Sequence, residues 1–139
     1  YSRGKIQRVL AGLNYLRDNK DMEPICVCHT QIKTINKPTL EPYDVFTLKL
    51  HKAASADVME WSDAILFLTF KTIVQKKDTG FGRKDGRAIN SGERIVLTNG
   101  SQGVECKNRF NLPAEIPCDY AEYHKLIAES RKGQVQEAA

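Results

Sequence analysis

The sequence has no long apolar run and none of the short motifs that build a catalytic centre by themselves. No segment approaches the roughly 18 consecutive apolar residues that a membrane span requires, which excludes an integral membrane protein. A Gly-x-x-x-x-Gly-Lys-[Ser/Thr] phosphate-binding loop, a Gly-x-Ser-x-Gly elbow and a His-Glu-x-x-His helix are also absent. The chain therefore shows no complete catalytic apparatus of its own.

Cysteine is scarce, with four in 139 residues, and its spacing does not indicate a metal site. Cys26 and Cys28 lie inside an apolar run, where free cysteine behaves as a small hydrophobe, and there is no pair of Cys-x-x-Cys knuckles. We therefore predict no bound metal and a reduced, cytoplasmic setting. The first residues, Tyr1 to Lys5, include neither an initiator Met nor the apolar core of a signal peptide, so we expect a fragment that is not secreted.

Charge is modest overall but concentrated in one segment. The length and the 41% hydrophobic and 27% charged residues are typical of one soluble globular domain, with a net charge of +4. The segment from Lys71 to Arg94 holds seven basic and three acidic residues, so its net charge of +4 equals that of the whole chain. The same segment contains four of the nine glycines. We expect this segment to be a mobile, exposed stretch.

Three helices and two buried strands are predicted from the apolar pattern. One helix covers residues 3–18, a second covers 53–62, and a third begins at Asp119, whose spacing to Glu122 resembles a capping box, and ends near Ser130. The short apolar runs 24–29 and 64–70 are typical of strands buried on both faces. Helices alternating with buried strands predict an α/β fold with parallel strands.

The remaining segments are predicted to be a loop, a hairpin and a tail. Residues 30–49 are polar, contain two prolines and show no period, which favours a long working loop. Residues 94–98 and 102–107 read as strands joined by the turn signal Asn99-Gly100, so we expect an antiparallel edge hairpin. Residues 131–139 are predicted to be a frayed polar tail.

Two polar positions are candidates for phosphate chemistry. His29 ends the first predicted strand, where open α/β sheets bind ligands, although it also fits a simple strand cap. Lys107 and Arg109 lie two residues apart as another strand ends, so they share a face if the strand continues and are able to converge on phosphate oxygens. Spacing alone favours the simpler interpretation, which is solvated charge at a strand end.

The basic segment is a candidate nucleic-acid contact. Cations on a glycine-rich stretch, with Phe81 near its centre, suit a phosphate backbone and occasional base stacking. A plain solvated hairpin, or a surface for an acidic partner, explains the same residues.

The order of several sequence blocks resembles the second half of RecA-like ATPases, especially phage nucleotide-binding proteins of the single-strand annealing type and, more distantly, the RadA family. "PICVCHTQIK" resembles the strand after the Walker B strand, "LKLHKAASADVMEWSDAILFLTFK" the following helix and strand, and "GERIVLT" a later strand. "ECKNRFNLP" resembles the Lys-Asn-Arg-Phe-Gly segment of RadA, with Asn111 in place of glycine. The resemblance spans residues 1–120.

The resemblance implies the C-terminal part of a RecA-like P-loop NTPase sheet, with residues 1–130 as a partial ATPase domain that lacks the Walker A and Walker B segments. His29 would sense the γ-phosphate of ATP, and Lys107 and Arg109 would be trans-acting cations in a ring or filament of identical subunits. ATP and Mg²⁺ are implied for the full-length protein, with none bound by this chain alone. Single-stranded DNA would be contacted by basic loops that contain Lys33, Lys37, Lys76, Lys77, Phe81, Arg83, Lys84 and Arg87.

The function that follows is a fragment of an ATP-binding protein in phage DNA recombination or single-strand annealing. The alternative is a non-catalytic module that binds single-stranded nucleic acid.

Overall fold

The computed structural model describes residues 3–78, 84–101 and 103–137, without the side chains of 74–78, 84–90 and 133–137. The chain divides into two compact units. Unit 1 comprises Tyr1–Ile65 and Gly100–Lys107, and unit 2 comprises Leu66–Asn99 and Asn108–Ala139. Both units combine helices with strands, so the fold is mixed α/β.

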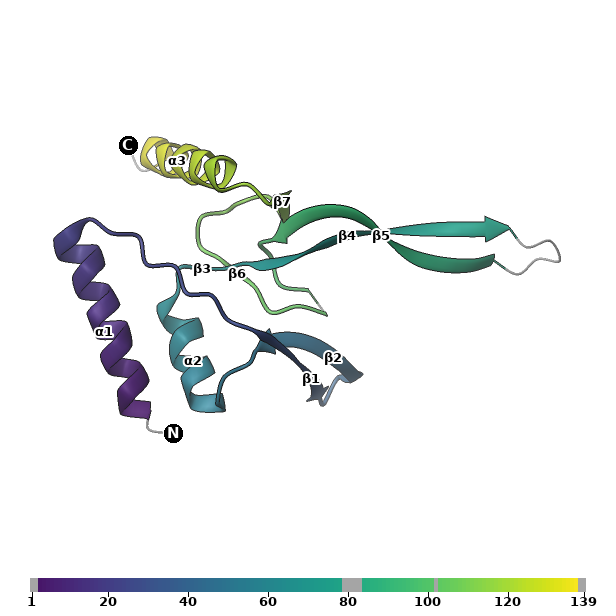
Figure 1. Ribbon diagram of the computed structural model, residues 1–139, viewed down its shortest axis with the longest axis horizontal. Coiled ribbons are helices and arrows are strands. Elements are labelled where there is room, and N and C mark those ends of the chain that lie inside the picture. The colour runs from purple at the N-terminus through teal and green to yellow at the C-terminus, as the bar shows by residue number, and fades with distance from the viewer. Residues whose placement is uncertain (1–2, 79–83, 102, 138–139) are drawn as a thin grey trace. The chain divides into compact units, whose positions relative to one another are not determined.

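Two neighbouring helices form one half of unit 1 (Figure 1). Helix α1 (Arg3–Lys20) and helix α2 (Lys52–Trp61) confirm the two predicted helices within two residues at each end. Leu10 of α1 and Ala54 of α2 are buried. Helix α1 ends because Asp21 adopts a left-handed conformation with φ of 52°, and the N–H of Met22 then bonds the Leu16 carbonyl.

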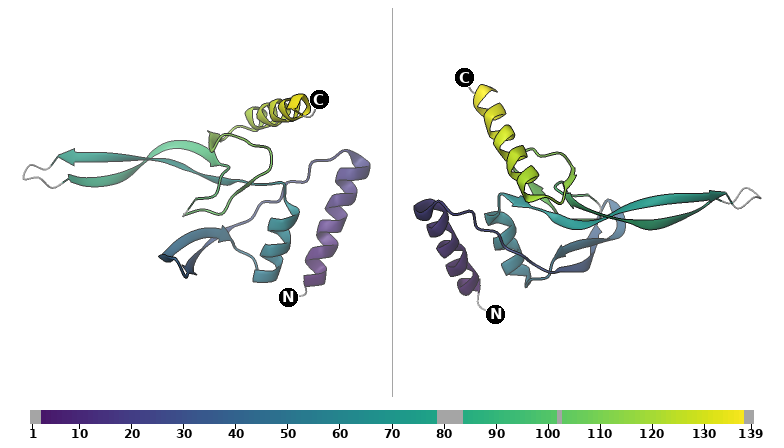
Figure 2. Two further views of the ribbon diagram at one scale, coloured as in Figure 1. Left: turned by 180° about the vertical axis from the view of Figure 1, so that it is seen from behind. Right: turned by 45° about the horizontal axis from the view of Figure 1, so that its top comes forward.

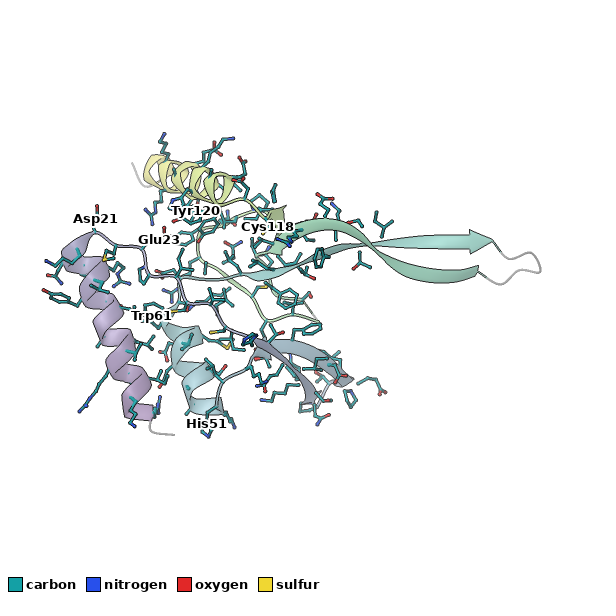
Figure 3. The ribbon with its side chains drawn as sticks, viewed as in Figure 1. Asp21, Glu23, His51, Trp61, Cys118 and Tyr120 are labelled. Carbon is teal, nitrogen blue, oxygen red and sulfur yellow. The ribbon has the colours of Figure 1, made fainter. Side chains whose placement is uncertain are left out.

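Polar contacts at two points fix α1 against α2. The guanidinium of Arg3 donates to both carboxylate oxygens of Asp57, at 2.9 Å from Nε to Oδ2 and 2.6 Å from Nη2 to Oδ1. The indole Nε1 of Trp61, at the far end of α2, donates to Asn14 Oδ1 at 2.7 Å (Figure 3). These bonds set both the spacing and the register of the two helices, because each is directional.

A hairpin forms the other half of unit 1, where the sequence predicted a loop. Strand β1 (Thr30–Lys37) pairs antiparallel with β2 (Leu40–Leu48) through the two-residue turn Pro38-Thr39. The loop prediction for residues 30–49 was wrong because most positions on both strands are exposed, which removes the apolar alternation that marks a half-buried strand. Val45 is the buried exception.

The predicted buried strand at residues 24–29 is not formed. These residues are assigned to no strand, and Ile25 and Val27 are 65% and 95% exposed. Within the part of the chain that the structure describes, residues 25–28 make no main-chain hydrogen bond. A strand requires a neighbour for its N–H and C=O groups, and β1 finds that neighbour in β2. Residues 25–28 have no such neighbour in the described part of the chain.

Unit 2 is built on a long antiparallel hairpin (Figure 2). Strand β4 (Phe67–Asp78) pairs with β5 (Lys84–Leu97), and β7 (Glu115–Pro117) pairs with the last residues of β5. The register shifts between Phe70 and Thr72, opposite residues 91–93 of β5. Gly92 has φ of 79° there, a conformation that glycine adopts without the strain of a side chain.

The strand predictions in this region are confirmed in part. Residues 64–70 do form strands, β3 (Ala64–Ile65) and the start of β4, but Leu68 is 64% exposed rather than buried. Residues 94–98 lie largely within β5, yet β5 pairs with β4 and β7. Residues 103–107, the described part of the predicted second strand, do not pair with β5. The short strand β6 (Lys107–Asn108) pairs with β3.

The expected parallel sheet is absent from the described residues. The pairings of β1 with β2, of β4 with β5 and of β5 with β7 are all antiparallel. One isolated parallel bridge joins Phe46 to Val104. The basic segment that was expected to be a mobile stretch is mostly strand, because cross-strand hydrogen bonds do not require apolar side chains.

Helix α3 (Tyr120–Glu137) closes the chain and extends seven residues past its predicted end at Ser130. Its start is confirmed, since Asp119 Oδ1 accepts from the Glu122 N–H at 2.9 Å. Ile127 packs this helix into the core of unit 2 with Ile95, Val96, Leu112 and Ile116. No helix in the described ranges combines the length and apolarity needed to cross a bilayer.

The Arg3–Asp57 pair predicts how stability depends on pH. Hydrogen bonds from Arg3 hold the pKa of Asp57 below its usual value, against the opposing effect of burial. A lowered carboxyl pKa stabilises the fold above the ordinary pKa of aspartate and loses that effect as pH falls through the lowered value. We expect Asp57→Asn to unfold at lower urea than the native chain at pH 7.

The measurement is the urea midpoint of both proteins from pH 7 down to pH values below the ordinary carboxyl range. The two midpoints are expected to converge in acid, because Asp57 is then protonated in the native chain as well. A difference that stays constant across this range contradicts the assigned role of the pair. Asp18→Asn serves as a matched control, since Asp18 pairs with Arg17 on the exposed surface.

Candidate functional site

The β4–β5 hairpin holds four of the eight candidate nucleic-acid residues within its described part. Beyond the register shift the strands pair residue by residue, with Gln75 opposite Arg87, Lys76 opposite Gly86 and Lys77 opposite Asp85. Four of the predicted contacts therefore occupy neighbouring rungs of one ladder: Lys76, Lys77, Lys84 and Arg87. Phe81 and Arg83 lie outside the described residues.

The length of this hairpin exceeds what the core of unit 2 uses. Strands β4 and β5 have 12 and 14 residues, but only Ile95–Leu97 of β5 pair with β7. Within the described residues the part beyond the register shift is a two-stranded ribbon (Figure 2). A two-stranded ribbon contributes little stability of its own, so its length is not explained by packing.

The cations nearest the core have partners within unit 2. Lys71 Nζ lies 2.8 Å from Glu115 Oε1, and this hydrogen bond raises the pKa of Lys71. The guanidinium of Arg94 lies 5.8 Å from the centre of the Phe70 ring, within range of a cation–π contact. These two residues anchor the base of the hairpin, so the residues beyond the register shift carry its candidate function.

The other two candidate DNA contacts lie in unit 1. Lys33 and Lys37 are both exposed on β1. Lys37 is the last residue of the strand and lies next to the turn. Lys37 Nζ lies 5.9 Å from the centre of the Tyr43 ring on the facing strand. The two side chains thus extend from a regular strand and not from the loop that was predicted.

His29 does not end a buried strand, so the positional argument for a phosphate sensor is lost. The residue is exposed and directly precedes β1, and its carbonyl accepts from the Lys49 N–H at 2.8 Å. That bond closes the open end of the β1–β2 hairpin. The role of His29 toward a nucleotide stays a prediction that rests on the resemblance.

Lys107 has a structural role that its spacing did not reveal. Its ammonium donates to the carbonyls of Met59 and Glu60, at 2.8 and 3.0 Å. These carbonyls belong to the last turn of α2, whose partial negative charge favours a cation. In this conformation Lys107 caps a helix of its own unit, and a trans-acting role would require it to release both carbonyls.

Arg109 lies in unit 2 and is exposed. It follows Asn108, which sequence reasoning did not single out. The Asn108 amide donates to Asn99 Oδ1 and to the Leu112 carbonyl, both at 2.9 Å, and its oxygen accepts from the Leu112 N–H at 3.0 Å. Asn108 thereby closes the loop that presents Arg109. In the sequence, its position between Lys107 and Arg109 is the only feature that could have indicated this role.

Asn111 adopts a backbone conformation that few residues take. The residue has φ of 52°, in the left-handed region, and lies on the loop closed by Asn108. Glycine adopts this region without cost and asparagine more readily than most other residues. Asparagine therefore suits this turn.

We predict that Asn111→Gly leaves stability unchanged, whereas Asn111→Val lowers it by about 1–2 kcal/mol, the cost of the left-handed region for a branched residue. Urea unfolding of the two variants measures the difference. Ala114→Val is the control, because Ala114 is exposed on the same loop with an ordinary backbone conformation. Equal losses in Asn111→Val and Ala114→Val contradict the backbone argument.

Cysteine and metal chemistry do not supply a site in the described residues. All four cysteines are free, and Cys26, Cys28 and Cys118 are exposed. No group of three or more His, Cys, Asp or Glu side chains is arranged to hold a metal within the ranges that the structure covers.

A family model described as an AAA domain matches residues 4–110, which includes nearly all of unit 1 and both strands of the long hairpin. Comparisons with curated proteins and with solved structures gave no significant match.

Proposed function

Since the chain belongs to the AAA domain family, whose members bind nucleotides, we propose that it is the part of such a protein that contacts single-stranded DNA. The observation that carries the proposal is the hairpin beyond the register shift. It extends further than the core requires and places Lys76, Lys77, Lys84 and Arg87 on neighbouring rungs.

Charge and geometry both favour a polyanion as the ligand. Between Gln75 and Arg87 there are five cations and two anions in thirteen residues. Cations spaced along a narrow ribbon follow the phosphates of a flexible strand, and this contact is independent of sequence. A folded acidic protein would need a shape-matched surface, which a two-stranded ribbon offers less of.

ATP and Mg²⁺ are the ligands that the family implies for a complete protein. The residues present do not fit them, because the sequence has no phosphate-binding loop and the described residues hold no metal-binding cluster. No hydrolysis step therefore follows from this chain. The proposal assigns nucleotide chemistry to a RecA-like P-loop sheet formed with residues outside the chain, in a ring or filament of identical subunits.

The process we propose is DNA recombination or single-strand annealing in a phage-encoded system, on the strength of the ordered sequence blocks. Arg109 is the better candidate for a trans-acting cation, because it is exposed whereas Lys107 caps α2. The second candidate function is a module that binds single-stranded nucleic acid without catalysis. The missing phosphate-binding loop favours this non-catalytic module. ATP turnover by the full-length protein would favour the ATP-binding recombination protein, and its absence would favour the module.

The test is binding of the 139-residue chain to a fluorescent single-stranded oligonucleotide over a range of salt. In the first variant Lys76, Lys77, Lys84 and Arg87 are all changed to Gln. If each contacts one phosphate, the slope of log K against log salt flattens by about 3, because single strands contribute about 0.7 per contact. Affinity falls in parallel.

A charge-matched variant separates the hairpin from net charge. Lys5, Arg8, Lys20 and Lys132 are exposed cations outside the hairpin, and their change to Gln lowers the net charge equally. This variant is expected to keep nearly the native slope. Equal slopes for both variants, or a native chain that binds no single strand at low salt, contradict the proposal.

A further inference from the structure

The core end of the β4–β5 hairpin exposes apolar side chains that a phosphate contact does not use. Leu68 and Phe70 of β4 are exposed, Phe70 to 44%, and they share a face because they lie two residues apart. Ile73, just past the register shift, is exposed as well. Within the described residues β4 is the outermost strand of its sheet, and an edge strand with this many exposed apolar side chains is typical of a covered surface.

Arg94 completes this surface from the facing strand. The register places Arg94 directly opposite Phe70, so both side chains lie on one face of the hairpin. The guanidinium is exposed, lies 5.8 Å from the ring centre and forms no ion pair among the residues that the structure describes. The cation–π contact therefore holds a planar cation in place without neutralising its charge.

A ring and a guanidinium plane are the two kinds of side-chain surface on which nucleobases stack. Phe70 and Arg94 are in contact before any ligand arrives, which lowers the entropy that is lost when a base packs against them. A nucleotide also suits both halves of the pair, because its base has flat faces for the ring and its phosphate carries a charge opposite to that of Arg94.

The surface is continuous with the cations further along the hairpin. Lys76 lies six residues beyond Phe70 on the same strand, which is about 20 Å at the rise of a β-strand. A flexible single strand that follows the cations therefore reaches Phe70 without leaving the ribbon. The net charge of +4 between Lys71 and Arg94 favours such a polyanion over a second copy of the chain, which carries the same charge.

We infer that Phe70 and Arg94 form a base-stacking site for the single-stranded DNA that the hairpin binds. The inference rests on the proposed function, in which the cations contact phosphates, and adds that the chain also holds bases. The site accepts any base, because every base has a π-face. A duplex offers phosphates but keeps its bases stacked on one another, so the site favours single strands.

The test compares binding of the 139-residue chain to two fluorescent strands at one low salt concentration. One strand carries ten thymidines, and the other carries ten abasic sugars with the same phosphates. Phe70→Ala is expected to weaken binding of the thymidine strand about tenfold, as the loss of one stacked base does. Binding of the abasic strand is expected to stay near native. Phe70→Tyr keeps the ring and is expected to bind both strands like the native chain.

Two further variants separate stacking from the fold and from charge. Leu68→Ala removes an exposed apolar side chain from the same face and is expected to leave both affinities near native. Arg94→Lys keeps the charge but loses the guanidinium plane. It is expected to weaken the thymidine strand more than the abasic strand and to keep the native salt slope. If Phe70→Ala fails to fold, Arg94→Lys decides by the same comparison.

Equal losses of both strands in Phe70→Ala overturn the inference, and so does native affinity of this variant for the thymidine strand. Sedimentation tests the other occupant of the surface. A native chain that dimerises, with Phe70→Ala monomeric and its DNA affinity unchanged, assigns the surface to a second copy and overturns the base-stacking site.

Failure of the proposed function gives a different result. If the variant with four neutralised hairpin cations keeps the native salt slope, the phosphate contact of the hairpin is wrong. A selective loss of the thymidine strand in Phe70→Ala then still supports the stacking site. A native chain that binds neither strand overturns both proposals.

Discussion

Main-chain pairing is the constraint on which the structure depends, because every N–H and C=O removed from water needs a partner. The chain meets it with neighbours that are close in sequence: β1 finds β2 across a two-residue turn, and β4 finds β5 as a long hairpin. Residues 24–29 have the composition of a central strand, but residues 25–28 form no main-chain hydrogen bond within the described structure, and Val27 is 95% exposed. Apolar composition alone therefore does not make a strand, because each strand needs a partner.

The same constraint explains which parts of the fold were predictable. Helices satisfy their hydrogen bonds locally, so the apolar pattern over residues 3–18 and the cap at Asp119 sufficed to place α1 and the start of α3. Strand identity at 64–70 was also predictable from composition. Strand partners were not, because pairing depends on residues distant in sequence and on exposed positions such as those of β1, where no apolar alternation reports the strand.

The candidate site follows a similar division. The cluster of cations between Lys71 and Arg94 was predictable from the sequence by its charge. Which of these cations lie on neighbouring cross-strand pairs became known only from the register of β4 and β5. Lys107 and Asn108 show where sequence reasoning failed. Lys107 was chosen as a phosphate contact but caps the end of α2, and Asn108 was passed over although it closes a loop. A cation at a strand end satisfies the carbonyls of a helix terminus as readily as a phosphate, and only the position of α2 distinguishes the two.

The hairpin extends further than packing within unit 2 explains. It continues past the residues of β5 that pair with β7, and a two-stranded ribbon contributes little stability of its own. We propose that a bound single strand supplies the stabilisation that the core does not. The contacts between α1 and α2 are different, because Arg3 with Asp57 and Trp61 with Asn14 already satisfy one another within unit 1.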